Sequence, residues 1–310
     1  MKNKGLVLYL TNGCNLNCNY CFVNKNNKQI LDFDKYREII EKYKNDISYI
    51  TFFGGEPLLC IDLIKKIINY NKTNNYNYYY ILNTNGTLLN KDIINLIINN
   101  NILVNASLDG NLLSNKNRFN RNIFNVVIKN IKELLNNNID VIINYVITPN
   151  NIEYFHDSLL FFKDNNIKEI CLLINYDIKW TNKDINEFKN QLYESIDLFN
   201  KDLKVYPIDS KIHLLKDNLE EHKCDFGNEN IVVSQEGDLY PCISFIDEKY
   251  KNKSEYINEV NTSNCNNCSY LKYCINNCMC RSINVNGFKF NCKLEKIYID
   301  LAKEIINKTR

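Results

Sequence analysis

Three cysteines stand close together near the start of the chain, where Cys14, Cys18 and Cys21 form a C-x3-C-x2-C run. A cubane iron–sulfur cluster is normally held by four thiolates. Three thiolates therefore leave one iron open to another ligand, and an open metal position is where metal chemistry takes place. The alternative is a structural zinc site, which would need four ligands. Because no fourth ligand lies near the run, the sequence favours the cluster.

The spacing, with Tyr20 directly before the third cysteine, resembles that of the radical S-adenosylmethionine (SAM) superfamily. The resemblance implies that the open iron chelates the amino and carboxylate groups of SAM. It also implies that an electron from the cluster cleaves SAM to a 5′-deoxyadenosyl radical. A reductant such as flavodoxin or ferredoxin is then expected as a partner.

The bulk composition is that of an ordinary soluble globular protein, with 310 residues of which 45% are hydrophobic and 24% charged. The formal charge of +2 argues against nucleic acid or an acidic membrane as a partner. No apolar run has the length of a membrane span or of a signal-peptide core. Thirteen clustered cysteines indicate metal rather than a disulfide scaffold, so a reducing cytoplasm is the expected location.

Residues 5 to about 205 alternate short β-branched or aromatic runs with longer amphipathic runs, which predicts a parallel α/β domain. Six such units predict a partial (β/α)6 TIM-like barrel over residues 1–205. The expected strands are 6–11, 48–53, 78–83, 103–108, 140–147 and 169–174. The expected helices are 34–45, 60–73, 90–100, 122–137, 151–165 and 181–200.

Most of the distinctive residues directly follow these predicted strands, at the end where parallel barrels build active sites. By resemblance, the GGEP loop that begins at Gly54 binds the SAM amino group, and the SLDG element that begins at Ser107 contacts SAM near the ribose. Arg118 and Arg121 are candidates for pairing with the SAM carboxylate. A turn or capping role is the alternative for each residue. The expected cofactor-binding residues are Tyr20, Gly54, Gly55, Glu56, Asn83, Ser107, Asp109, Arg118 and Asn144.

Eight of the thirteen cysteines lie between Cys224 and Cys292, and their spacing resembles the seven-cysteine pattern of SPASM domains. Such domains hold two auxiliary [4Fe-4S] clusters, and a zinc ribbon is the alternative. We therefore expect a small cysteine-rich α+β domain at 224–310 after a polar bridge at 206–223. It would contain a hairpin pairing 231–233 with 239–240 and a closing helix. By resemblance, the first cluster is held by Cys224, Cys242 and Cys278, and the second by Cys265, Cys268, Cys274 and Cys292.

Two departures from the family pattern bear on the substrate. No cysteine stands shortly before Cys224, so the first auxiliary cluster has an open iron or takes His222 or Cys280 as a ligand. An open iron could bind a substrate thiolate. Sulfatase-maturating members place an aspartate directly after the cysteine that matches Cys242, whereas this chain has Ile243. Cys280 is also the candidate catalytic residue, as a hydrogen-atom donor.

The resemblance covers nearly the whole chain and implies an enzyme that modifies a ribosomally made peptide, by thioether or carbon–carbon crosslink formation. A peptide epimerase, or an oxidase of a peptide or protein side chain, is the alternative. A zinc-stabilised binding protein without enzymatic activity is an alternative from another class. Because the first cluster cysteine is residue 14, no leader-binding domain fits before it, and a separate leader-binding protein is a possible partner.

Overall fold

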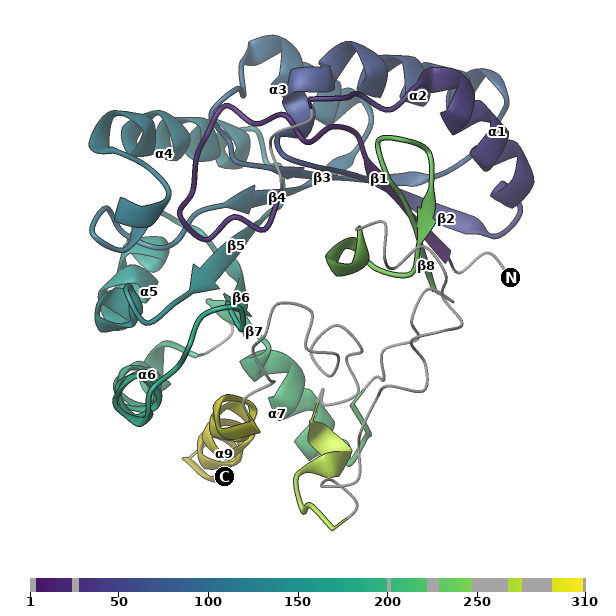
Figure 1. Cartoon of the computed structure of the whole chain (residues 1–310). Helices are drawn as coiled ribbons and strands as arrows, with labels where there is room; N and C mark the ends of the chain where they lie inside the picture. The colour runs from purple at the N-terminus through teal and green to yellow at the C-terminus, as the bar shows by residue number, and fades with distance from the viewer. Residues whose placement is uncertain are drawn as a thin grey trace. The chain divides into compact units, whose positions relative to one another are not determined.

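The computed structural model of the chain describes residues 4–23, 28–199, 202–221, 229–246, 267–274 and 292–308. Helices and strands alternate through most of it (Figure 1). The strands are β1 (Lys4–Tyr9), β2 (Ile47–Phe53), β3 (Tyr79–Thr84), β4 (Ile102–Ser107), β5 (Val141–Ile147), β6 (Glu169–Ile174), β7 (Lys204–Tyr206), β8 (Asn230–Val233) and β9 (Leu239–Tyr240). The α-helices are α1 (Phe33–Tyr43), α2 (Ile61–Thr73), α3 (Lys91–Asn99), α4 (Arg121–Asn136), α5 (Phe155–Asp164), α6 (Asn182–Glu194), α7 (Ile208–Lys216) and α9 (Cys292–Lys308).

These elements fall into two compact units, which we describe separately. The first unit comprises residues 1–107, 121–141 and 225–255. Its strands lie in the order β4-β3-β2-β1-β8-β9, and every neighbouring pair is parallel except β8 and β9. Helices α1, α2 and α3 lie along one side of β1–β3 (Figure 1). Apolar side chains from both layers, such as Leu8, Ile40, Phe52 and Ile67, are buried between them.

The second unit comprises residues 108–120, 142–224 and 256–310. Its parallel strands lie in the order β5-β6-β7. The core is aromatic: the Phe188 ring makes edge-to-face contacts with Phe155 and with Tyr298 of α9, with ring centroids 5.9 Å and 5.7 Å apart. Aromatic pairs in this geometry stabilise a core beyond the area that they bury. The C-terminal helix α9 is thereby packed into this unit.

The α/β fold class is confirmed, with a strand followed by a helix six times in succession from β1 to α6. The predicted hairpin is also confirmed, since β8 and β9 pair antiparallel around Gly237, whose φ is +86°. Its parallel pairing with β1 was not expected. The closing helix is confirmed as α9.

The segment predicted as a polar bridge, residues 206–223, contains the helix α7 at Ile208–Lys216, and its role as a bridge stays a prediction. The sequence of α7 mixes charged and apolar residues, and this mixture obscures the helical pattern. The buried face of the helix is formed by Ile208 and Lys211, three residues apart. The two compact units are each made of three separate segments, so their limits differ from those of the predicted domains at 1–205 and 224–310. The two domains therefore remain a prediction.

Several predicted site residues lie outside the described residues, namely His222, Cys224, Cys265, Cys278 and Cys280. Within the described part of the chain, no helix is long and apolar enough to cross a membrane.

Candidate active site

The three clustered cysteines lie on the long loop that follows β1 in the first unit. Cys14 and Cys18 are half-buried, Cys21 is exposed, and all three are free thiols. The loop closes on itself where the Cys21 amide donates to the Cys18 carbonyl over 3.2 Å. Tyr20, half-buried, forms part of the same turn.

Tyr9 is the last residue of β1 and lies directly before the loop that carries the three cysteines. Burial raises the pKa of its hydroxyl above the ordinary value, and nearby negative charge on Cys21 and Cys14 raises it further. The two outer thiols of the run therefore lie near the same hydroxyl. Within the described residues, no three ligating side chains gather tightly enough to hold a single metal ion. A cubane cluster binds each cysteine through a different iron and so keeps its thiolates apart.

Asn85, just past β3, contacts the first cysteine of the run. Its Nδ2 lies 3.8 Å from Cys14 Sγ and 2.9 Å from Asn15 Oδ1, and it donates to both. The Leu16 amide also donates to Cys14 Sγ, over 3.4 Å. N–H donors aimed at a ligating sulfur stabilise negative charge on it and tune the cluster. These two donors would stabilise a thiolate at Cys14.

The loop that contains Gly54 and Gly55 is joined to the cysteine loop through the backbone. The Gly55 amide donates to Thr11 O over 2.7 Å, and the Glu56 amide donates to Gly13 O over 2.8 Å. Gly54 has a φ of +141°, a conformation that side chains disfavour. A methyl group at Gly55 would stand 2.3 Å from Gly13 O, so this close approach requires glycine.

Glu56 is fully buried, and its side chain faces the protein rather than open space. It accepts hydrogen bonds from the Leu58 amide, the Thr84 hydroxyl and the Asn85 amide, at 3.1, 2.8 and 2.7 Å. Desolvation raises its pKa to about 7 although these donors act in the opposite direction. Glu56 therefore joins the loops after β2 and β3, and its place among the expected cofactor-binding residues stays a prediction.

The predicted residues Asn83 and Ser107 are half-buried at the ends of β3 and β4. Asn83 accepts a 3.3 Å hydrogen bond from Asn105, its register partner on β4. Asn105 Oδ1 is buried without a hydrogen-bond partner among the described residues. A buried acceptor of this kind normally has a partner, so a ligand with a donor group fits here. Asn105 was missed because a single asparagine in an apolar strand gives no motif.

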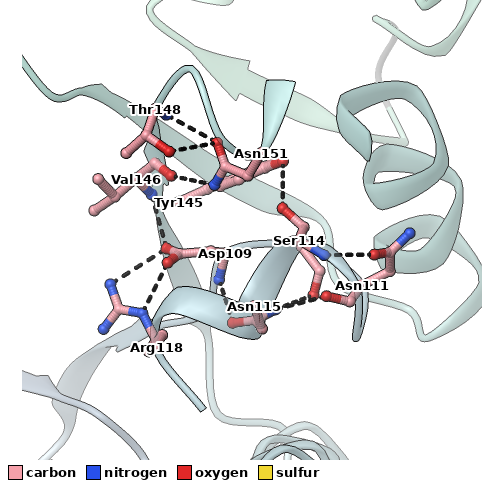
Figure 2. Close-up of polar contacts among 10 residues, drawn as sticks. Asp109, Asn111, Ser114, Asn115, Arg118, Tyr145, Val146, Thr148 and Asn151 are labelled. Carbon is pink, nitrogen blue, oxygen red and sulfur yellow. Dashed lines mark hydrogen bonds and ion pairs between the residues drawn. The ribbon is translucent and has the colours of Figure 1, made fainter. Parts of the chain in front are cut away.

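The predicted residues Asp109 and Arg118 form one ion pair in the second unit (Figure 2). Arg118 donates from Nε and Nη2 to the two carboxylate oxygens over 3.1 Å and 3.2 Å, and the Val146 amide donates over 3.0 Å. The Asp109 side chain is fully buried and that of Arg118 is 8% exposed. The Asp109 carboxylate thus orients Arg118 within the protein, and the expected role of both residues in SAM binding stays a prediction.

Asn115 holds the turn that carries this pair (Figure 2). Its Oδ1 accepts from the Asp109 amide over 2.9 Å, and its Nδ2 donates to the carbonyls of Gly110 and Asn111. Gly110 has a φ of +90°, and a methyl group there would stand 2.1 Å from Ser158 Oγ. The sequence had pointed to the aspartate and glycine but not to Asn115, six residues on.

Asn144 contributes its backbone to the same region, where its carbonyl accepts from the Leu108 amide over 3.1 Å. Four of the C-terminal cysteines are described, and all are free thiols. Cys242 follows β9, Cys268 and Cys274 flank a short 3-10 helix (Leu271–Tyr273), and Cys292 begins α9.

Comparison with known proteins decides the family. The model of the radical SAM superfamily matches residues 8–162, which is half of the chain. The chain belongs to the radical SAM superfamily. Membership implies a [4Fe-4S] cluster and SAM, and the thiols of Cys14, Cys18 and Cys21, with two N–H donors at the Cys14 sulfur, fit such a cluster.

Two characterised relatives match most of this radical SAM chain. The cysteine-type anaerobic sulfatase-maturating enzyme of Clostridium novyi is 28% identical over 88% of this chain and 87% of its own length. The radical SAM cyclopropyl synthase TigE of Paramaledivibacter caminithermalis is 26% identical over 89% of this chain and 68% of its own length. The uncharacterised protein MJ0907 of Methanocaldococcus jannaschii is 44% identical over 95 residues, which cover 29% of this chain and 33% of that protein's length.

Solved structures share the fold. The enzyme anSMEcpe with bound AdoMet and a Cp18Cys peptide has a TM-score of 0.79 at 21% identity, with 98% of each chain covered. Streptococcus suis SuiB bound to S-adenosylmethionine has a TM-score of 0.66 at 18% identity, with 94% of this chain and 77% of SuiB covered. The predicted α/β fold of the radical SAM enzymes is thereby confirmed.

Proposed function

We propose that this radical SAM enzyme modifies a ribosomally made peptide by forming a thioether or a carbon–carbon crosslink. The observation that carries the proposal is the junction of the Cys14–Cys21 loop with the Gly54–Gly55 loop, made through Thr11 O and Gly13 O, in a chain of this superfamily. Its relatives include a sulfatase-maturating enzyme and a cyclopropyl synthase, and anSMEcpe has been solved with a peptide bound.

When SAM is bound, it would supply a 5′-deoxyadenosyl radical for the abstraction of one hydrogen atom from the peptide. In our proposal Cys14, Cys18 and Cys21 hold the cluster, and Asn85 donates to the Cys14 sulfur. Glu56 fixes the backbone of the glycine loop that binds the SAM amino group. In our proposal Asp109 orients Arg118 to pair with a carboxylate, and Asn83, Ser107 and Asn144 are further expected cofactor-binding residues.

A crosslink removes two hydrogen atoms from the peptide. One would leave as a hydrogen atom, and the other would leave as a proton and an electron. An auxiliary [4Fe-4S] cluster held by the C-terminal cysteines would accept the electron, and solvent would accept the proton. The helix N-terminus at Cys292 favours a negatively charged group, which suits such a cluster.

A second candidate is an oxidase of a protein side chain, because the match to the sulfatase-maturating enzyme covers most of both chains. Ile243, after Cys242, opposes it, since isoleucine cannot accept a proton where those enzymes carry aspartate. For a peptide epimerase, the candidate donor Cys280 lies outside the described residues.

Reconstitution without oxygen followed by reduction tests the proposal. We expect 5′-deoxyadenosine from the wild-type protein and none from Cys18→Ala. Peptides encoded beside the gene, together with unrelated cysteine-containing peptides as controls, are then analysed by mass spectrometry. Loss of two hydrogens with a new crosslink supports the proposal. A peptide whose mass is unchanged in H2O but which takes up deuterium in D2O indicates an epimerase instead. Intact SAM would overturn both.

A further inference from the structure

A lysine is fully buried in the second unit, although no motif points to it. Lys211 lies on the inner face of α7, and its side chain has no exposed surface. A buried ammonium group is costly unless ion pairs and hydrogen bonds compensate for the lost water. Its partners therefore show what holds this part of the molecule together.

Three groups from three segments surround the Lys211 ammonium. Glu295 of α9, 1% exposed, lies 2.7 Å away through Oε1. The Tyr273 carbonyl accepts a hydrogen bond over 2.6 Å, and Glu221 forms a second ion pair. We call Lys211, Glu221, Tyr273 and Glu295 the lysine cluster.

The partners of Lys211 are close in sequence to predicted cluster ligands. Tyr273 directly precedes Cys274, and Glu295 follows Cys292 by three residues. One ammonium group thus joins the segment of Cys274 to the first turn of the helix that Cys292 begins. Glu221 precedes Cys224 by three residues in the sequence.

Two more contacts fix the same segments. The Tyr270 hydroxyl, two residues after Cys268, donates to Asp300 of α9 over 2.9 Å. The Glu221 amide donates to the Lys272 carbonyl over 2.8 Å. The short helix between Cys268 and Cys274 is therefore attached to α9 at one end and to Lys211 at the other.

Packing alone does not require this arrangement, because apolar residues of similar volume commonly stabilise a core as well as a buried ion pair does. The lysine cluster differs from an apolar core, because its ion pairs and hydrogen bonds form only in one arrangement of the partners. We propose that Lys211 is a positioning residue that holds Cys274 and Cys292 in place to ligate the same auxiliary [4Fe-4S] cluster. The inference rests on the auxiliary clusters of the proposed function.

Replacing Lys211 by methionine keeps an unbranched side chain, shorter by one atom, and removes its charge. We expect wild-type protein reconstituted without oxygen to hold about twelve irons, as three cubane clusters require. Lys211→Met is expected to lose about four irons or more while still cleaving SAM, because Cys14, Cys18 and Cys21 belong to the other unit. The matched control is Lys204→Met, which removes an exposed ion pair with Glu169 and should keep the wild-type iron content.

Labelling with iodoacetamide identifies the ligands that are released. Cys274 and Cys292 should be labelled in reconstituted Lys211→Met and protected in the wild type. If Lys211→Met does not fold, Glu221→Gln decides, because that carboxylate is 16% exposed and its loss is milder. Wild-type iron content and wild-type protection in the folded variant would overturn the inference. About four irons in the wild-type protein, with SAM cleavage intact, would overturn the auxiliary clusters and the inference with them but not the SAM chemistry.

Discussion

The backbone amide of Asn85 donates a 2.7 Å hydrogen bond to the Glu56 carboxylate, 29 residues earlier in the chain. Asn85 in turn donates through its side chain to Cys14 Sγ. The loops after β1, β2 and β3 are therefore joined by one carboxylate and one amide. A change at Glu56 should therefore alter the surroundings of Cys14, although none of the hydrogen bonds described above joins the Glu56 carboxylate to Cys14.

Glu56 should give stability an unusual dependence on pH. Its pKa is raised to about 7 from an unfolded value of 4.5, so the folded chain binds more protons between these values. Stability from this group is complete below pH 4.5 and falls as the pH rises through about 7, by up to about 3 kcal/mol. Glu56→Gln removes this slope and places an N–H donor against the Asn85 amide, which costs about 1–3 kcal/mol. Denaturant unfolding of the apo-protein at pH 5 and pH 8 measures both effects.

The difference between Glu56→Gln and wild type should therefore be smaller at pH 8 than at pH 5. The exposed Glu38→Gln provides the control for a carboxylate on the surface of α1. An equal difference at the two pH values would show that the folded protein does not hold Glu56 protonated.

Gly55→Ala should separate the glycine loop from the cysteine loop. The new methyl group would meet Gly13 O at 2.3 Å and Asn12 O at 2.7 Å, and both are backbone atoms that cannot rotate away. Overpacking of this kind costs about 1–3 kcal/mol and moves the backbone. We expect loss of SAM cleavage and of the iron held by Cys14, Cys18 and Cys21. The control is Gly13→Ala, whose methyl group would stand 3.3 Å from the movable Thr11 hydroxyl, and it should keep both.

The sequence predicts the elements of this fold well because their patterns are local. The strand expected at 169–174 coincides with β6, and the other five expected strands differ from the observed ones by one or two residues at one or both ends. Alternating burial, as in β5, produces such a signal. The α7 helix was missed because Lys211 interrupts its apolar face, and the reason for that lysine lies in Glu221, 10 residues further along, and in Glu295 of α9.

The candidate site was predictable in its residues but not in their contacts. Cysteine spacing and glycine loops mark Cys14, Gly55 and Asp109 without any structure. Which way the acidic side chains point depends on donors from other strands, such as the Asn85 and Val146 amides. For that reason the sequence could not indicate that Glu56 accepts from the Asn85 amide or that Asp109 pairs with Arg118.

Asn85→Ala should lower the reduction potential of the cluster held by the first three cysteines. The variant loses the N–H donor to Cys14 Sγ, which stabilises the additional negative charge of the reduced cluster. A redox titration followed by electron paramagnetic resonance measures the potential directly. Asn74→Ala, an exposed residue at the end of α2, is the control. An unchanged potential in Asn85→Ala would show that the Leu16 amide alone is sufficient.

Asp109→Asn should destabilise the second unit and weaken SAM binding. The variant leaves the Arg118 charge, 8% exposed, without its carboxylate and sets an amide donor against the guanidinium. Breaking a buried pair in this way costs about 3–5 kcal/mol. Asp34→Asn, which removes a carboxylate from an exposed pair with Arg37, should change stability little.

Arg118→Lys separates the effect on stability from the effect on SAM binding, because it keeps a positive charge opposite Asp109 but loses the bidentate hydrogen bonds. Unfolding curves measure the stability, and titration with SAM by calorimetry measures the binding. If Asp109 orients Arg118 for a carboxylate, Arg118→Lys weakens SAM binding more than it lowers stability. Equal losses in both measurements would assign the pair to stability alone.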